Sequence, residues 1–388
     1  MFFKNKSFKN AHTREIEISL SSVTMLYMSL SIGIVGLPNV GKSTLFNALT
    51  DSNILAANYP FATIEPNTGI VPVPDPRLEK LGELYHTQKI IPATVTFVDI
   101  AGLVAGASKG EGLGNQFLSH IRSCNAICQV VRAFENPDVL RSDSSRDPLH
   151  DIDVINTELV LADLQTVEKR LPRLEKECRA NPKLKPVFEL LSTINQKLND
   201  GEPLWKDHEL LEQYQEHLSD LQLMTAKPIL YLFNLDEQEL SNSTFKDELQ
   251  QMVAPATTVF VSAKLEDELR GLDETDRMEM LESYGQTEPG LNQLIHAAYD
   301  LLGLQSYLTA GEKEVRAWTV HKGATAPQAA GVIHTDFEKG FIAAQIVSYD
   351  DLIATGSESA AKSAGKMRTE GKTYLMQEGD VVEFRFNN

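Results

Sequence analysis

The chain has 388 residues, enough for about two or three domains, and its formal net charge is −18. Its hydrophobic fraction of 42% is ordinary for a globular protein with a packed core. No apolar run approaches the roughly 20 residues that a membrane-spanning helix needs, so we expect no membrane partner. Three cysteines do not make a disulfide framework, which favours a reduced, cytoplasmic setting. The acidic charge excludes nucleic-acid binding by the whole surface, because phosphate binding requires local cations.

Residues 1–27 differ in character from the rest of the chain. They are polar, with scattered lysines, and they end just before Met28 and the first apolar run. Glu15, Glu17 and the lack of a long apolar core argue against a signal peptide. We therefore expect either a disordered extension or an upstream start codon that is not used.

Short apolar runs alternate with helical patterns through much of the chain. Runs of this length suit buried strands of a parallel sheet that is covered on both faces. We expect strands at Ser31–Gly36, Thr94–Asp99, Ile127–Arg132, Pro228–Phe233 and Thr257–Ser262, with helices at Lys42–Leu49 and Gly114–Ser123. The alternation predicts a doubly wound α/β domain.

A second pattern interrupts this alternation. Apolar residues recur at spacings of three and four from Val160 to Leu174 and again from Leu184 to Leu198, on either side of Asn181-Pro182. The pattern predicts an antiparallel helical hairpin, or two ordinary amphipathic helices packed on the main domain. Pro172 should kink or divide the first helix.

The chain after Leu304 has a third character. Val315–Val320, Gly340–Ile346 and Val381–Phe386 have strand-like content, and glycines separate them, which predicts a small β-rich domain. This tail carries nine Lys/Arg and eleven Asp/Glu, so most of the acidity lies elsewhere. Four of its basic residues fall close together in sequence: Lys362, Lys366, Arg368 and Lys372. They form either a partner surface or a solvated helix face.

The strongest motif is a phosphate-binding loop at 36–44, Gly-Leu-Pro-Asn-Val-Gly-Lys-Ser-Thr. It follows an expected strand and opens an expected helix, so backbone N–H groups and the helix N-terminus can surround phosphate oxygens. We expect Lys42 to bridge the β- and γ-phosphates and Ser43 to ligate Mg²⁺. The other phosphate-binding residues of this loop should be Asn39, Val40, Gly41 and Thr44.

Two further motifs belong with a triphosphate site. Asp99 ends an apolar run and is followed by Gly102, so the carboxylate can hold Mg²⁺ directly or through water and the glycine N–H can reach the γ-phosphate. Thr63 lies between the phosphate loop and Asp99 in the sequence, and we expect it to be a second Mg²⁺ ligand. We therefore expect Lys42, Asp99 and Gly102 to be catalytic, and the glycine-rich stretch 105–114 to be a switch.

The base-recognition element departs from the guanine-specific pattern. GTPases of this architecture carry Asn-Lys-x-Asp, and the Asp accepts two hydrogen bonds from guanine. Here the strand ends in Asn234-Leu235-Asp236-Glu237. Adenine lacks the two guanine donors, so a site without that acceptor loses its main reason to reject ATP. We expect Asn234, Leu235 and Ser262, the last in a loop after the next strand, to bind the nucleotide, with ATP preferred and GTP weaker.

These residues resemble the YchF/Obg-like ATPases, which belong to the translation-factor GTPases by fold. The match runs from about Ser29 to Asn388 and rests on the loop at 36–44, on Phe-Ala-Thr-Ile-Glu-Pro at 61–66, on Asp-Ile-Ala-Gly-Leu-Val at 99–104 and on three stretches of the tail, at 315–319, 323–331 and 334–341. The resemblance implies a P-loop NTPase domain at 28–148 and 206–303, a coiled-coil insertion at 149–205 and a C-terminal β-grasp TGS domain at 304–388. It further implies slow hydrolysis of ATP, binding of adenine through the Leu235 backbone, a role in translation or stress regulation, and a ribosome contact, to RNA or protein, through the TGS domain and the helical arm.

At two positions the chain lacks a residue that is catalytic in many related hydrolases. Leu103 stands where many GTPases have a water-orienting Gln, and Arg141 stands where family members often have a His. Arginine cannot act as a base near neutral pH, although it can stabilise phosphoryl charge. Asn39 could hold K⁺ against the phosphates in place of a missing cationic group. Two alternatives to an ATPase stay open: a GTPase with relaxed base specificity, and a nucleotide-gated binding module with incidental hydrolysis.

Overall fold

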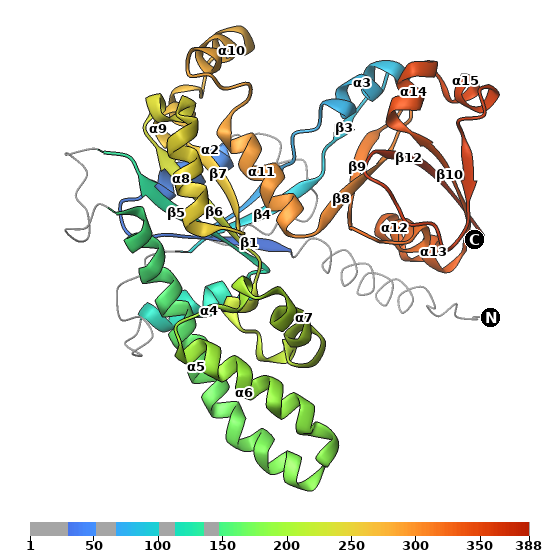
Figure 1. Ribbon diagram of the computed structural model, residues 1–388. Coiled ribbons are helices and arrows are strands. Elements are labelled where there is room, and N and C mark those ends of the chain that lie inside the picture. The colour runs from blue at the N-terminus through green and yellow to red at the C-terminus, as the bar shows by residue number, and fades with distance from the viewer. Residues whose placement is uncertain (1–29, 52–66, 101–112, 136–146, 388) are drawn as a thin grey trace, which may run out of the picture. The chain divides into compact units, whose positions relative to one another are not determined.

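The structure, a computed structural model, describes residues 30–51, 67–100, 113–135 and 147–387 (Figure 1). The chain divides into two compact units. The first, which we call the α/β unit, consists of Ser31–Val71 and Thr96–Leu302, and the second, the C-terminal unit, combines Pro72–Val95 with Gly303–Asn388. Within the described ranges, no helix is both long and apolar enough to cross a membrane.

A six-stranded sheet forms the centre of the α/β unit, in the order β2-β4-β1-β5-β6-β7. β1 pairs in parallel with β4 and β5, β5 pairs in parallel with β6, and β6 with β7. Parallel neighbours require crossover connections, which the helices supply. The strands are β1 Ser31–Val35, β2 Thr68–Pro72, β4 Thr94–Asp99, β5 Ala126–Ala133, β6 Ile229–Leu235 and β7 Thr257–Val261. The doubly wound prediction is confirmed, and each predicted strand begins within a residue of its expected start.

Two inner strands, β5 and β6, explain why continuous apolar runs mark this sheet. Every residue of β6 is buried, as is every residue of β5 except Ala133. Helix α11 packs against β6 and β7, and α5 packs against β5, so neighbouring helices remove these strands from water. Apart from the helical insertion, the helices of this unit are α2 Lys42–Asp51, α4 Leu113–Ser123, α8 Ser243–Val253, α9 Ala263–Glu268, α10 Glu274–Ser283 and α11 Gly290–Leu301.

The helical insertion is a hairpin with its own core. Its helices are α5 Pro148–Ala180, α6 Lys185–Asn199 and the shorter α7 His208–His217. Val167 and Leu174 of α5 are buried against Leu191 and Ile194 of α6. This packing within the insertion confirms the hairpin over two separate helices lying on the sheet. We call α5 and α6 the arm (Figure 1).

Helix α5 is continuous through Pro172, so the helix is not divided there. Proline removes one backbone hydrogen bond, but apolar contacts on both sides of it hold the two halves to α6. The middle of α5 is held in place by Asp163, whose buried carboxylate accepts hydrogen bonds from the backbone N–H groups of Met224 and Thr225 at 2.9 and 2.7 Å. Burial raises the pKa of Asp163, and these two hydrogen bonds oppose the shift.

The C-terminal unit is a mixed sheet in the order β11-β10-β12-β8-β9-β3. β8 and β9 form an antiparallel hairpin, β12 lies parallel to β8, and helix α12 shares a core with this sheet. The arrangement agrees with the expected β-grasp domain. Its elements are α3 Pro76–Tyr85, β3 Ile90–Ile91, β8 Leu304–Thr309, β9 Val315–His321, α12 Ala326–Ile333, α13 Thr335–Lys339, β10 Phe341–Ser348, α14 Tyr349–Thr355, α15 Glu358–Ser363, β11 Arg368–Glu370 and β12 Asp380–Phe386.

Residues 72–95 lie with the C-terminal unit, although the resemblance counts them in the nucleotide domain. Strand β3 pairs in parallel with β9, and Arg77 of α3 forms an ion pair with Glu378 at 2.5 Å. The unit thus acquires an edge strand and a helix from a segment more than 200 residues away in sequence.

Candidate nucleotide-binding site

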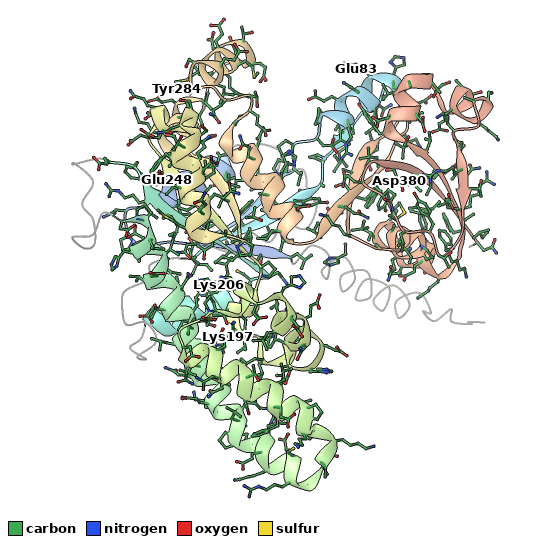
Figure 2. The ribbon with its side chains drawn as sticks, in the orientation of Figure 1. Glu83, Lys197, Lys206, Glu248, Tyr284 and Asp380 are labelled. Carbon is green, nitrogen blue, oxygen red and sulfur yellow. The ribbon has the colours of Figure 1, made fainter. Side chains whose placement is uncertain are left out.

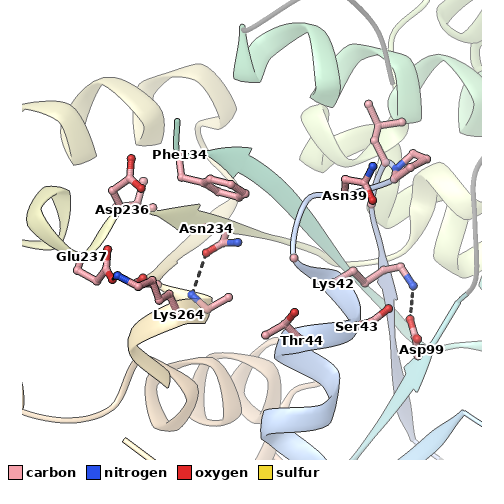
Figure 3. Close-up of a pocket in the computed structure, with 17 residues that line it drawn as sticks. Asn39, Lys42, Ser43, Thr44, Asp99, Phe134, Asn234, Asp236, Glu237 and Lys264 are labelled. Atoms are coloured by element: carbon pink, nitrogen blue, oxygen red, sulfur yellow. Dashed lines mark hydrogen bonds and ion pairs between the residues drawn. The ribbon is translucent and has the colours of Figure 1, made fainter. Parts of the chain in front are cut away.

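A cavity of about 650 Å³ lies where the carboxyl ends of β1, β4, β5, β6 and β7 meet. In open α/β sheets this edge is the usual place for a ligand. Figure 3 shows two groups of residues facing each other across it. Asn39, Lys42, Ser43, Thr44 and Asp99 form one end, and the other end carries Phe134, Asn234, Asp236, Glu237 and Lys264.

The loop between β1 and α2 forms the first end. Gly41 has φ +95°, a left-handed conformation that glycine adopts without strain, and a Cβ there would collide with the Asn234 side chain. Asn39 is also left-handed, with φ 64°. Helix α2 begins at Lys42, and the exposed Ser43 and Thr44 lie in its first turn. The helix N-terminus therefore faces the cavity with its partial positive charge.

Lys42 and Asp99 meet at this end of the cavity. The Lys42 ammonium forms an ion pair with the Asp99 carboxylate, and both side chains are mostly buried. Asp99 ends β4, which lies next to β1, so sheet register places it beside the loop. The chemistry is suited to a polyanion with a divalent cation: a lysine that can turn to phosphate, a carboxylate, and the Ser43 hydroxyl.

Asn234 connects the two ends of the cavity. Its Nδ2 donates to the Val40 carbonyl at 2.9 Å, and its Oδ1 accepts the Ala263 N–H at 2.9 Å. Asn234 is 4% exposed and Val40 is 2% exposed, so these hydrogen bonds lie away from water. Val40 was predicted to bind phosphate. Its side chain is buried, and its carbonyl holds the loop in place by accepting the hydrogen bond from Asn234. We call the pair of hydrogen bonds the Asn234 bridge.

The base end is built from the ends of β6 and β7. Leu235 lines the cavity but is only 2% exposed, so what it offers a ligand is chiefly backbone. Ser262 is buried and caps α9 by accepting the Leu265 N–H. Glu237 forms an ion pair with Lys264 at 2.5 Å. Burial alone would raise the pKa of Glu237, but the hydrogen bond from Lys264 leaves it lowered, so the carboxylate is ionised and already engaged.

Five residues outside the predicted set also line this end: Phe134, Asp236, Glu237, Ala263 and Lys264. Phe134 follows β5, and the Arg132 guanidinium lies 4.3 Å from its ring centroid. Asp236 accepts the backbone N–H of Glu135 at 3.0 Å, which ties the end of β6 to the end of β5. An aromatic ring beside a strand end was the available signal for Phe134, but it becomes informative only once β5 is known to neighbour β6.

Several predicted positions lie outside the described residues: Thr63, Gly102, Leu103 and Arg141. Their roles stay predictions. Within the described residues no cluster of three or more His, Cys, Asp or Glu side chains could hold a metal by itself. Mg²⁺ is usually held by one or two protein oxygens together with substrate phosphates and water. The Ser43 hydroxyl and the Asp99 carboxylate fit this donor set.

The basic residues of the tail are partly neutralised within the C-terminal unit. Lys366 pairs with Asp351 at 3.1 Å, and Arg368 pairs with Asp380 at 3.5 Å. Arg368 also lies 5.4 Å from the ring centroid of Tyr374. Two of the four cations that sequence groups together are therefore engaged in folding contacts.

Comparisons with known proteins agree with this geometry. The sequence profile of a family described as 50S ribosome-binding GTPase matches residues 31–170, and that of the YchF GTPase C-terminal domain, described as a protein of unknown function, matches 304–387. The chain is 52% identical to the ribosome-binding ATPase YchF of Haemophilus influenzae, covering 93% of this chain and 100% of the relative. It is 50% identical to the Bacillus subtilis protein of that name with the same coverage. The solved structure of the Schizosaccharomyces pombe YchF GTPase has a TM-score of 0.80 and 39% identity, covering 92% of this chain and 98% of that one.

Proposed function

The chain belongs to the YchF family of P-loop nucleotide hydrolases, and we propose that it binds and hydrolyses ATP in preference to GTP, with Mg²⁺, while associating with ribosomes. The ribosome part rests on the names of its relatives. The base preference rests on one observation in this chain, the ion pair between Glu237 and Lys264.

Two carboxylates line the base end, and the protein itself engages each of them: Asp236 accepts the Glu135 N–H, and Glu237 pairs with Lys264. The Glu237 carboxylate is bound by Lys264, and both polar atoms of Asn234 are committed to the Asn234 bridge. Guanine would have to displace Lys264 to gain its two hydrogen bonds, whereas adenine has no donors at those positions. What is left for either base is the backbone near Leu235 and the ring of Phe134. Guanine therefore loses its advantage, and ATP is accepted.

The phosphate end supplies the groups for phosphoryl transfer. Lys42 turns from Asp99 to the β- and γ-phosphates, and backbone N–H groups of the loop from Asn39 to Thr44 surround the remaining oxygens. Ser43 would ligate Mg²⁺, and Asp99 would hold it directly or through water. When bound there, Mg²⁺ would supply positive charge against the charge that develops on the transferred phosphoryl group. Asn39 would hold K⁺ against the same phosphates.

Competition between ATP and GTP tests the base preference. The purified protein is titrated with fluorescent ATP and GTP analogues, which are then displaced by unlabelled nucleotide. Unlabelled ATP should displace either probe at lower concentration, whereas a tighter GTP would establish the relaxed GTPase instead. Combining Leu235→Lys with Glu237→Asp should move the preference towards GTP.

A second substitution tests the ion pair itself. Lys264→Gln frees the Glu237 carboxylate to accept hydrogen bonds from guanine. GTP affinity should therefore rise relative to ATP affinity by about tenfold, which corresponds to the smallest contribution, about 1.5 kcal/mol, of a hydrogen bond to a charged acceptor. Lys80→Gln, which removes an exposed lysine from the C-terminal unit, is the matched control and should leave the ratio unchanged. An unchanged ratio in Lys264→Gln would mean that the ion pair does not set the preference.

A further inference from the structure

The far end of the arm has a charge opposite to that of the chain. Residues 169–185 contain seven Lys/Arg and two Asp/Glu, a local net charge of +5 in a chain of −18. They cover the end of α5, the turn at Asn181 and the first residue of α6. We call residues 169–185 the arm tip.

The cations of the arm tip lie on the outer face of α5. Lys169, Arg173 and Lys176 follow a spacing of four and three, which places them on one side of a helix. The apolar residues Val167 and Leu174 lie on the opposite side and are buried against α6. All three cations are exposed, and so is Lys183 in the turn. The packing of the arm therefore does not use these four side chains.

The two carboxylates of the arm tip are already occupied. Glu177 accepts two hydrogen bonds from Arg170, both at 3.0 Å, and Glu175 pairs with Arg179 at 2.7 Å. The hydrogen bonds from Arg170, assisted by the charge of Arg173, lower the pKa of Glu177. In the part of the chain that the structure describes, Lys169, Arg173, Lys176 and Lys183 form no ion pair.

Three other basic residues, Lys197, Lys366 and Arg368, differ in this respect. Lys197, nearer the root of the arm in Figure 2, is held by Glu202 at 3.0 Å and by Asp207 at 3.1 Å. In the tail, Lys366 and Arg368 are paired within their own unit. The arm tip thus combines a high density of cations with four that form no ion pair among the described residues.

The position of the arm tip matters as much as its charge. Thirteen residues separate Lys176 from Asp163, where α5 is pinned to the α/β unit, which is about 20 Å along a helix. The Debye length at physiological salt is about 8 Å, so the acidic body is largely screened from whatever the tip contacts. An acidic protein can therefore contact a polyanion through the cations at the end of its arm.

We propose that the arm tip is an RNA-binding surface, in which Lys169, Arg173, Lys176 and Lys183 contact the phosphate backbone of a structured RNA. The proposal deepens the proposed function and rests on its ribosome association, for which it names the contacting residues and the RNA as partner. Recognition is by charge and shape, as is usual for double-stranded RNA, and carries no base specificity.

The test replaces all four cations by glutamine, an uncharged residue that favours helix. Binding of a fluorescein-labelled RNA hairpin with a 16-base-pair stem is measured by anisotropy from 50 to 200 mM KCl. The wild-type chain should bind, and its log affinity should fall with log salt. The variant should bind at least about tenfold more weakly at the lowest salt, with a slope flatter by about 3, because each contacted phosphate contributes roughly 0.7 to 0.9. ATP turnover without RNA and the unfolding midpoint should be unchanged.

A matched control changes the net charge equally in another place. It replaces four exposed lysines of the C-terminal unit by glutamine: Lys80, Lys322, Lys362 and Lys372. The control should bind the hairpin like the wild type. Equal losses in the two variants, or a loss in the control alone, would overturn the proposal, because the effect would then come from overall charge or from the tail.

Co-sedimentation with purified ribosomes separates this proposal from the proposed function. If the wild type sediments with ribosomes and the arm variant does so equally, the arm tip is not the contact, although the proposed function stands. If the arm variant loses ribosomes but binds the hairpin like the wild type, the partner at the tip is a ribosomal protein and the RNA proposal fails. If the wild type does not co-sediment with ribosomes in any nucleotide state, the ribosome part of the proposed function fails. The hairpin measurement then still decides whether the arm tip binds RNA.

Discussion

Replacing Asn234 by alanine should separate the two ends of the nucleotide site. The substitution removes the Asn234 bridge and leaves the Val40 carbonyl and the Ala263 N–H without their partner. An unsatisfied buried polar group costs about 1–3 kcal/mol. In the variant, the space left by the Asn234 side chain opens onto the cavity that Ala263 lines, so water can reach the Ala263 N–H. Val40, which is 2% exposed, is not among the residues that line the cavity. We therefore expect a net cost of about 2–3 kcal/mol, concentrated in the phosphate loop.

The cost should appear mainly as lost nucleotide affinity. If the loop must be reordered on binding, 2–3 kcal/mol corresponds to roughly 30- to 150-fold weaker ATP binding. Fluorescent ATP titration measures this directly. Competition by inorganic tripolyphosphate, which has no base, should weaken to a similar degree, because the bridge shapes the loop that holds the phosphates.

The matched control is Asn242→Ala, the same chemical change at the N-cap of α8, a residue that does not line the cavity. Asn242 accepts the Phe245 N–H at 3.1 Å at the start of α8, so its loss should cost about 1 kcal/mol of stability without changing ATP affinity. An Asn234→Ala variant that binds ATP within about twofold of wild type would refute the structural role of the bridge. A variant that loses ATP but keeps tripolyphosphate affinity would show that Asn234 reads the base instead.

Three other outcomes are expected from the same geometry. Lys42→Ala should largely abolish phosphate release, and Ser43→Ala should raise the Mg²⁺ concentration needed for turnover without unfolding the protein; wild-type turnover in the lysine variant would show that another loop is active. Hydrolysis by the isolated protein should be slow and faster in KCl than in NaCl, and equal rates would reject a cation-holding role for Asn39. Burial raises the pKa of Glu266 to about 7 from 4.5, while backbone N–H groups of Gly290 and Leu291 oppose the shift. The native state therefore keeps a proton that the unfolded chain releases between about pH 4.5 and 7, and this contribution to stability is lost as pH rises through that window. Glu266→Gln should consequently stabilise the protein by about 2–3 kcal/mol at pH 8 but not at pH 4, by urea unfolding; equal midpoints for the two proteins at pH 8 would contradict it.

Five of the six strands of the α/β unit were predicted, and only the alternately buried β2 was not. Burial on both faces of a strand leaves the most direct mark on sequence. β5 and β6 are buried almost throughout, so they appear as unbroken apolar runs. The phosphate loop was equally visible, because its chemistry requires glycine and lysine at fixed spacing. Strand β3 has only two residues and is defined by its pairing with β9, which no local pattern could reveal.

The base end of the site was only half predictable. Asn234 and Leu235 could be placed by their position at the end of a strand. Phe134 follows β5 and Lys264 lies in α9 after β7, and both reach the cavity because β5 and β7 neighbour β6. The charge of the arm tip is present in the sequence, yet its meaning depends on structure. Only the packing of α5 on α6 shows that the apolar side of α5 is buried and that its cationic side is exposed.

The Asn234 bridge explains how the base element can change while the site keeps its shape. Asn234 is occupied by the protein itself, on the phosphate loop at Val40 and on the next loop at Ala263, so its role does not depend on which base is bound. Leu235 and Glu237 are the positions that differ from the guanine-specific pattern, and they lie beyond the bridge at the end of β6. Loss of the guanine-reading carboxylate to Lys264 therefore leaves the loop that holds the phosphates intact. Base preference and phosphate binding are separable in this site, so replacing Leu235 and Glu237 should alter the first with little effect on tripolyphosphate affinity, whereas removing Asn234 should weaken ATP and tripolyphosphate binding to a similar degree.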